Sequence, residues 1–329
     1  MRPHEIQYYH LVVSPPPHIH AGTSYTLAMY TWAAALMPAA IYAVTLYGMH
    51  AVRVMSFSMA GAMCFELIIQ KLFKQPVTTH DGTALCTGLL FAMILPPGAP
   101  WWLILVGTFI AILIGRQIYG GVGGNPMNPV LIGWAAVRLS WGDYLSFDYA
   151  AINYHLPFSY EYPLTLLKKA GTSGIEGFSY LDLLLGKQVG GIGAAAVLLI
   201  IIGGLFLILR GVISWRIPAS FLFGVAVTSL VFWKVNPNMY ADPLFHLLTG
   251  NVMIGAFFIA TEYSSSPVNK TAMLLYGLGC GVFTILFRAW SNYMDGVPFA
   301  ILIMNIAAPL LDRIKPAVRA IVRVKEPLS

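Results

Sequence analysis

The segment GGVGGNPMNP, residues 120–129, interrupts a long apolar region with glycine, asparagine and proline. Glycine lets a flat ligand or another chain segment approach the backbone, and asparagine caps the free ends of helices. The segment is therefore typical of two structures: a backbone that contacts a ligand, or a tight turn with Pro126 or Pro129 in the first turn of the next helix. The residues that could contact a ligand are Gly120, Gly121, Gly123, Gly124, Asn125 and Asn128.

Two further polar clusters stand at the edges of apolar runs, HDGTALCTG at 80–88 and TEYSSSP at 261–267. An acidic or hydroxyl side chain at the start of a helix caps free N–H groups and complements the helix dipole. The same groups could instead border a flavin or cation site between two halves of the protein. The candidate binding residues in these clusters are Asp81, Thr83, Thr87, Ser264 and Ser265.

Motifs for catalysis by this chain alone are missing from the sequence. It has no catalytic Ser–His–Asp pattern, phosphate-loop lysine or dinucleotide fingerprint. His18 and His20 have metal-like spacing but lack further ligands nearby, and Cys64, Cys86 and Cys280 are isolated in apolar runs. We therefore expect no metal site and no catalysis by this chain alone; a bound flavin would supply any redox chemistry.

The composition indicates a polytopic membrane protein. Of 329 residues, 58% are hydrophobic and 10% are charged, against about 25% charged in soluble domains, and the mean hydropathy is +0.72. About 20 apolar residues form one span, so the chain accommodates roughly ten. The expected spans are 26–48, 54–73, 83–97, 101–118, 127–141, 189–209, 217–234, 244–261, 272–290 and 297–311, of which the third and fifth are short.

The net charge of +6 comes from cations at the ends of apolar runs and in the tail. This pattern is typical of topology signals and predicts that both termini lie in the cytoplasm of a bacterial inner membrane; the start shows no cleavable signal peptide. The expected segments are a cytoplasmic N-terminal segment 1–25, a first membrane repeat 26–141, an external periplasmic loop 142–187, a second membrane repeat 188–313 and a basic cytoplasmic tail 314–329.

The repeats are suggested by internal similarity. LCTGLLFAMILPP at 85–97 resembles the stretch 247–267, with Thr-Gly pairs at 87–88 and 249–250 as the anchor. The similarity between 128–139 and 305–313 is fainter. Two five-helix halves in opposite orientations predict a site or pathway near the middle of the membrane.

Seven sequence blocks resemble one family from nearly end to end. The blocks are SPPPHIHAG, DGTALCTGLLFAMILPP, GGVGGNPMNPVLIGW, LDLLLGKQVGGIG, VISWRIPASFL, PLFHLLTGNVMIGAFFIAT and GVPFAILIMNIAAPLLDR. They resemble the D subunit of the Rnf ferredoxin:NAD oxidoreductase complex and its relative NqrB of the sodium-pumping NADH:quinone reductase. The resemblance implies an all-α fold of about ten helices similar to urea transporters, other membrane and peripheral subunits as partners, and electron transfer coupled to Na⁺ or H⁺ movement.

The resemblance also implies FMN attached as a phosphoester to a threonine of an S-x-A-T motif, and in some members a riboflavin. Here SYEYPL at 159–164 places Glu161 at the alanine position and Tyr162 at the threonine position. Glu161 would repel an incoming FMN phosphate, so covalent FMN at Tyr162 is not expected. Thr165 and Thr172 are fallback acceptors, although both are more typical of ordinary loop residues.

Three functions remain open at this point. The first is a membrane subunit of an Rnf-type complex that holds a non-covalent FMN or riboflavin. The second is a redox-silent structural subunit of such a complex, which the departures at Glu161 and Tyr162 favour. The third is a small-solute or ion transport protein with a urea-transporter-like fold. Bound flavin separates the first from the second, and solute flux into liposomes separates the third from both.

Overall fold

The structure is a computed structural model that describes residues 24–145, 161–193 and 196–314. Every regular element within these ranges is a helix. The predictions for the first 23 residues, which include His18 and His20, lie outside the described residues. The same holds for Ser159 and for the tail beyond Ile314.

The helices form two groups along the chain with two small helices between them. The first group is α1 (Tyr25–Tyr47), α2 (Met49–Leu72), α3 (Thr83–Ile94), α4 (Trp101–Leu113) and α5 (Pro129–Ser140). The small helices are α7 (Pro163–Ala170) and α8 (Tyr180–Leu184). The second group is α9 (Val197–Leu209), α10 (Arg216–Val235), α11 (Pro243–Leu248), α12 (Val252–Ile254), α13 (Lys270–Trp290) and α14 (Val297–Leu311).

Five of these helical segments are long and apolar enough to cross a membrane: α1, α2, α4 with the turn that follows it, α10 and α13. Four shorter apolar helices, α3, α5, α9 and α14, pack among them. The protein is therefore a multi-pass membrane protein. The prediction that the third and fifth segments are short is confirmed, because α3 and α5 each have 12 residues.

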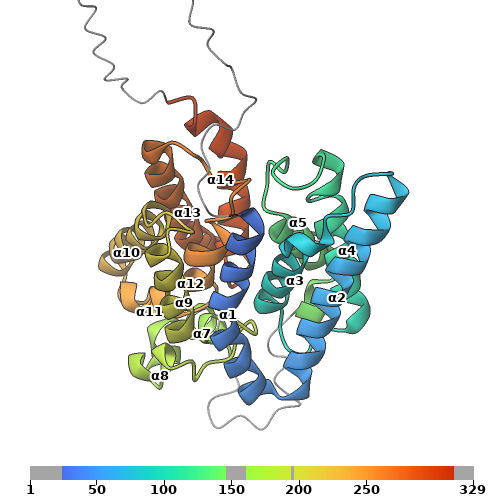
Figure 1. Ribbon diagram of the computed structural model, residues 1–329. Coiled ribbons are helices and arrows are strands. Elements are labelled where there is room, and N and C mark those ends of the chain that lie inside the picture. Colours follow the sequence, from blue (N-terminus) through green and yellow to red (C-terminus); the bar gives the residue numbers. More distant parts are fainter. Residues whose placement is uncertain (1–23, 146–160, 194–195, 315–329) are drawn as a thin grey trace, which may run out of the picture.

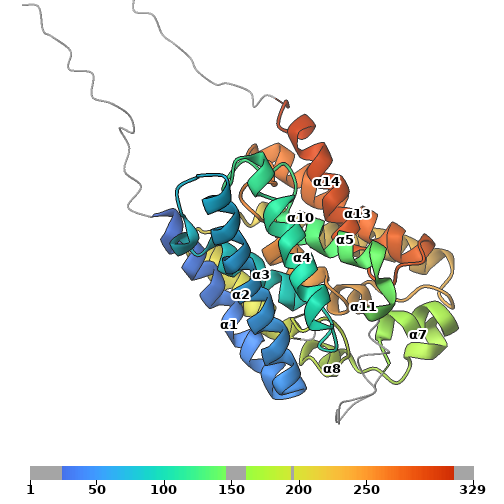
Figure 2. The same cartoon turned by 90° about the vertical axis from the view of Figure 1, so that its right-hand side faces the viewer.

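The two groups lie side by side. Figure 1 shows α2 to α5 on one side and α9 to α13 on the other, with α1 and α14 between them. The end of the molecule where α1 begins and α14 ends is called the terminal face. The opposite end, where α7 and α8 lie in both views (Figures 1 and 2), is called the loop face.

The helix pairings of one group recur in the other. In the first group α2 packs against α3 and α4, and α4 packs against α5; in the second, α10 packs against α11 and α13, and α13 packs against α14. Contacts of α1 with α9 and of α5 with α14 join the groups. Close packing between α1 and α9 requires glycine, because a Cβ at Gly203 would lie 2.3 Å from the Ala35 carbonyl oxygen.

The eighth expected span, 244–261, is not one continuous helix. It is divided into α11, α12 and a π-helical turn at Gly255–Ile259. The break lies at Thr249–Gly250, where Gly250 has a φ of +68° that favours glycine. The Thr-Gly pair at 87–88 lies inside the continuous helix α3 instead, so the two matched pairs have different backbone structures.

Candidate functional site

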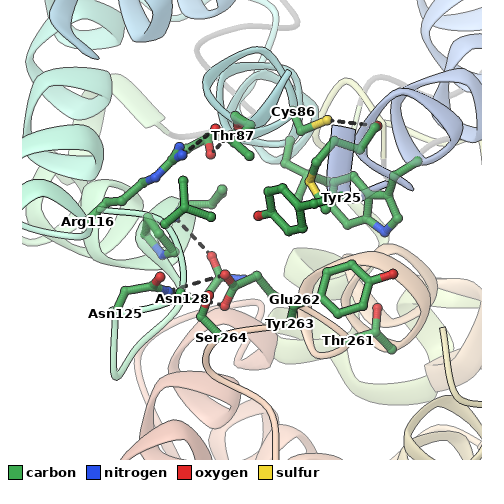
Figure 3. A pocket seen from close by; sticks show the side chains of 18 residues that line it. Tyr25, Cys86, Thr87, Arg116, Asn125, Asn128, Thr261, Glu262, Tyr263 and Ser264 are labelled. Carbon is green, nitrogen blue, oxygen red and sulfur yellow. Dashed lines mark hydrogen bonds between the residues drawn. The ribbon is translucent and has the colours of Figure 1, made fainter. Parts of the chain in front are cut away.

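A cavity opens at the terminal face where the two helix groups meet (Figure 3). Its apolar and aromatic lining comes from Tyr25, Met29, Trp32, Leu90, Val122 and Val130. Its polar lining comes from Thr83, Thr87, Arg116, Asn125, Asn128, Thr261, Glu262 and Ser264. The first group of helices thus supplies one wall and the segment after the π-helical turn supplies the other.

The structure brings six of the predicted binding residues to this cavity and leaves five beside it. Those that line it are Thr83, Thr87, Gly123, Asn125, Asn128 and Ser264. Those that do not are Asp81, Gly120, Gly121, Gly124 and Ser265. The three polar clusters of the sequence therefore converge on one place, although they lie far apart in the chain.

Asn128 joins the two helix groups below the cavity. Its Oδ1 accepts hydrogen bonds from the N–H of Val130 at 2.9 Å and of Leu131, and so caps α5 as predicted, with Pro129 in the first turn. Its Nδ2 donates to the Ile259 carbonyl at 3.0 Å. Its backbone N–H donates to Asn305 Oδ1 at 3.1 Å. The fully buried Asn128 side chain thus provides hydrogen-bond partners for backbone atoms of both helix groups.

Glu262 is held in place from both sides of the cavity. Asn125 Nδ2 donates to Glu262 Oε1 at 3.2 Å, and this bond spans the boundary between the helix groups. The backbone N–H of Ser265 donates to Glu262 Oε2 at 3.1 Å, and the Ser265 hydroxyl donates to the same oxygen. Ser265 therefore orients the carboxylate rather than lining the cavity. Burial raises the pKa of Glu262 above its ordinary value, and these donors only partly oppose that shift.

Sequence reasoning missed a buried ion pair at the edge of the cavity. Arg116 Nη2 lies 3.1 Å from Glu66 Oε1 and also donates to the Thr83 hydroxyl. Both charged side chains are buried, with exposed fractions of 4% and 0%. The available signal was Glu66 inside an apolar run, because an ionisable residue within a span requires a partner. From its position in the sequence, Arg116 is interpreted only as a topology signal.

The structure bears on two predictions about loops, one for Asp81 and one for the glycine segment. The suggestion that Asp81 caps the third span is wrong. α3 begins after Gly82, which makes no side-chain cap. Asp81 lies instead in a short 3-10 turn, where its Oδ1 is 3.5 Å from His80 Nε2. The glycine segment forms a turn that also lines the cavity, which is compatible with both of its interpretations. Gly120, Gly121 and Gly123 have φ values of +94°, +95° and +89°, which other residues rarely adopt.

A second cavity, of about 180 Å³, lies at the loop face. Its lining includes Trp134, Arg138, Tyr162, Thr165, Lys169, Asn251, Tyr293 and Asp295. Tyr162 is 1% exposed, although the sequence suggested an open loop. Burial, together with the Asp295 carboxylate, raises the pKa of the Tyr162 phenol well above its ordinary value. A neutral, enclosed phenol is a poor acceptor for group transfer.

The two fallback threonines differ in surroundings. Thr165 lies in the first turn of α7 and is 8% exposed. Thr172 is only partly buried, and its hydroxyl donates to the Asn238 carbonyl at 3.1 Å. The Thr172 hydroxyl thus has a partner in the fold, whereas Thr165 lines the loop-face cavity.

The free backbone groups at the break between α11 and α12 form hydrogen bonds with a buried ion pair. Arg288 donates to the carbonyl oxygens of His246 and Thr249, each at 2.8 Å. Its Nη2 lies 3.2 Å from Asp295 Oδ1, and Asp295 Oδ2 accepts from the Asn251 N–H at 2.7 Å. Broken backbone at membrane depth requires such partners. The His246 carbonyl and the Asn251 N–H at the break therefore both have hydrogen-bond partners.

Within the described ranges, no group of three or more His, Cys, Asp or Glu side chains is arranged to hold a metal ion. The chemistry that remains at the terminal-face cavity is non-covalent binding. Aromatic rings offer stacking surfaces, and Asn125, Ser264 and the Glu262 carboxylate offer hydrogen-bond partners around the rim.

Comparisons with a family model and with individual known proteins agree with each other. The NQR2, RnfD, RnfE family model matches residues 12–319. The chain is 38% identical over 319 residues to the D subunit of the Na(+)-translocating ferredoxin:NAD(+) oxidoreductase complex of Acetobacterium woodii, covering 96% of this chain and 97% of the relative.

Two further relatives carry related names. The D subunit of the proton-translocating ferredoxin:NAD(+) oxidoreductase complex of Clostridium ljungdahlii is 34% identical, covering 93% of this chain and 95% of the relative. The D subunit of the ion-translocating oxidoreductase complex of Pseudomonas paraeruginosa is 35% identical, covering 90% and 92%. The similarity thus extends over nearly the whole length of each protein.

Proposed function

The chain belongs to the NQR2, RnfD, RnfE family, and from this membership we propose that it is the membrane-embedded D subunit of an Rnf-type ion-translocating ferredoxin:NAD⁺ oxidoreductase complex. The end-to-end match to proteins of that name supports the proposal. One of these relatives is named for Na⁺ and another for protons, so family membership leaves the coupling ion open. Its partners are the other membrane and peripheral subunits of the complex.

We further propose that the terminal-face cavity binds a flavin without a covalent bond. Tyr25 and Trp32 provide aromatic walls, and Asn125 and Ser264 provide polar groups for a ring edge. The enclosed part of the cavity is only about 60 Å³, so a three-ring flavin would also occupy the open mouth. Both the Glu262 carboxyl and the Arg116 guanidinium line the cavity, so its charge does not select between riboflavin and FMN. When bound, the flavin would carry electrons.

Filling the cavity mouth is expected to release this flavin. Val122 lines the cavity and is 39% exposed, so Val122→Trp would block the mouth at little cost in folding. Ile118→Trp is the matched control, because Ile118 is 60% exposed nearby and does not line the cavity. Acid extraction of the purified complex followed by chromatography should give at least about tenfold less flavin from Val122→Trp, the effect of losing about 1.4 kcal/mol of binding.

The outcomes of this measurement separate two functions. Flavin lost with Val122→Trp but retained with Ile118→Trp supports the electron-carrying proposal. If acid extraction of the unaltered chain releases no flavin, the chain is a redox-silent structural subunit. Equal flavin content in both variants would show that the flavin lies elsewhere.

We propose that covalent FMN is absent from the loop that contains Tyr162. The buried, neutral phenol and the adjacent Glu161 both oppose transfer to this position. We expect no ultraviolet-fluorescent band for the unaltered chain on a denaturing gel, and an intact mass without FMN. The double variant Glu161→Ala with Tyr162→Thr restores the family motif. It should acquire the band in cells that contain the flavin transferase, whereas Glu161→Ala alone should not.

We propose that the two helix groups are inverted repeats, as in the urea-transporter-like fold that the sequence resemblance implied. The recurring helix pairings support this relation. So does the position of two buried arginines: Arg116 follows α4 near the terminal face, and Arg288 ends α13 near the loop face. An experimental structure in which residues 25–140 and 197–311 do not superpose after such an inversion would refute the proposal.

We propose that the terminal face is cytoplasmic in a bacterial inner membrane, because Lys71, Lys74, Arg210 and Arg313 lie toward it. Cysteine labelling tests this orientation in a Cys64→Ser background. Met49, at the loop face, and Val268, before α13, are 78% and 80% exposed. A membrane-impermeant maleimide added to intact spheroplasts should label Met49→Cys and leave Val268→Cys unlabelled; the reverse result would invert the topology.

A further inference from the structure

A groove of about 230 Å³ lies on the loop-face side of the second helix group, apart from the terminal-face cavity and adjoining the loop-face cavity at Met294. It runs between α7, the end of α10, α11 and the last turns of α13. Its walls are mainly apolar and come from Leu164, Leu167, Phe232, Met239, Ile285 and Ala289. An apolar groove on a membrane protein is the kind of surface that an acyl chain covers.

Aromatic side chains place the groove at the boundary between membrane and water. Trp290 ends α13 and is 72% exposed, and Trp233 lies near the end of α10 and is 37% exposed. Tryptophan is enriched at this boundary because its ring is apolar and its N–H is polar. A lipid in the leaflet at the loop face therefore has its headgroup at the level of the groove.

The groove carries positive charge without a matching carboxylate among its described lining residues. Lys168 lines it, and the Lys168 ammonium donates to the carbonyl of Ser291. Partial burial lowers the pKa of Lys168, because the ammonium has lost part of its hydration. An anion in the groove would therefore be complementary to Lys168.

An unpartnered buried donor also points to a ligand. Arg288 lines the groove and is 7% exposed. Its two terminal nitrogens contact His246, Thr249 and Asp295, but its Nε has no hydrogen-bond partner within the described structure. Buried donors normally have a partner, so one hydrogen-bonding position of the Arg288 guanidinium remains unfilled beside the groove.

We propose that this groove binds one phospholipid with an anionic headgroup, with an acyl chain along the apolar wall and the phosphate beside Lys168. The site rests on the groove, its charge and its position at the interface. It does not require that the terminal-face cavity binds a flavin, so either proposal can fail without the other.

The test uses the whole complex, purified and reconstituted with phosphatidylglycerol or phosphatidylcholine, with bound lipid counted by native mass spectrometry. We expect phosphatidylglycerol to be retained in preference to phosphatidylcholine. Lys168→Gln should weaken retention of phosphatidylglycerol about fivefold, as expected for one basic group near an anionic lipid. Lys234→Gln is the control, because Lys234 ends α10 at the same face without lining the groove.

A second variant tests the apolar wall. Ala289→Phe should fill the groove and abolish retention of the lipid, whereas Leu275→Phe, on an exposed part of α13, should not. If Ala289→Phe prevents assembly of the complex, the comparison of Lys168→Gln with Lys234→Gln still tests whether the groove binds the lipid. Equal retention of both lipids, an equal effect of Lys234→Gln, or a partner subunit cross-linked across an otherwise lipid-free groove would each overturn the proposal.

Discussion

Replacing Asp295 by alanine is expected to destabilise the protein by about 3–5 kcal/mol, because it leaves the buried charge of Arg288 without its partner. Asp295 is 9% exposed and Arg288 is 7% exposed. The variant also removes the acceptor for the Asn251 N–H, so a backbone donor at the break between α11 and α12 loses its partner. Thermal unfolding of the purified protein, followed by tryptophan fluorescence, measures the change.

Asp182→Ala is the matched control for this experiment. Asp182 also pairs with a cation, Lys187, at 2.8 Å, but both side chains are about half exposed, and water screens such pairs. Asp182→Ala should leave the unfolding transition nearly unchanged. If the two variants shift the transition equally, the pair of Arg288 and Asp295 is not the element that stabilises the helix break.

Substitution of Gly281 by alanine is expected to separate α10 from α13 and to cost about 1–3 kcal/mol, the usual range for overpacking. A Cβ at Gly281 would lie 2.4 Å from the Phe221 carbonyl oxygen and 2.6 Å from the Val225 nitrogen. Both atoms belong to the backbone of α10, so they cannot move aside as a flexible side chain would. The loss of stability is measured by the same unfolding experiment.

Gly142→Ala distinguishes this effect from a general intolerance of glycine replacement. A Cβ at Gly142 meets no atom within 4 Å, and its backbone is not left-handed. This variant should unfold with the unaltered protein. A Gly281→Ala protein that is as stable as Gly142→Ala would mean that α10 and α13 are not packed as closely as described.

Periodicity and composition predicted the helices and the interruption at 120–129, but not the break within the eighth expected span. Runs of apolar residues identify spans directly, and the short α3 and α5 followed from the flanking glycines and prolines. The break at Thr249–Gly250 could not be predicted in this way, because TGN is not a strong breaking sequence. It exists because Arg288, far along the chain, provides donors for the freed carbonyl groups.

The candidate site was predicted only in part, again because contacts between distant segments could not be predicted. Glycine, asparagine and threonine near the span edges identified most of the polar lining of the terminal-face cavity. The pairing of Glu66 with Arg116 and the burial of Tyr162 depend on tertiary contacts between distant segments. A single sequence does not show directly which distant residues are in contact.

Asn305 and α14 connect the surroundings of the two cavities. Its side chain bonds the Asn128 N–H, the Ser265 carbonyl and the Tyr276 hydroxyl, and so clamps three segments at the base of the terminal-face cavity. From Asn305 the rigid helix α14 runs back to Val297, next to Asp295 in the loop-face cavity, a distance of about 12 Å. One continuous helical segment therefore carries both the Asn305 hydrogen bonds on one side of the membrane and the start of the segment beside Asp295 on the other.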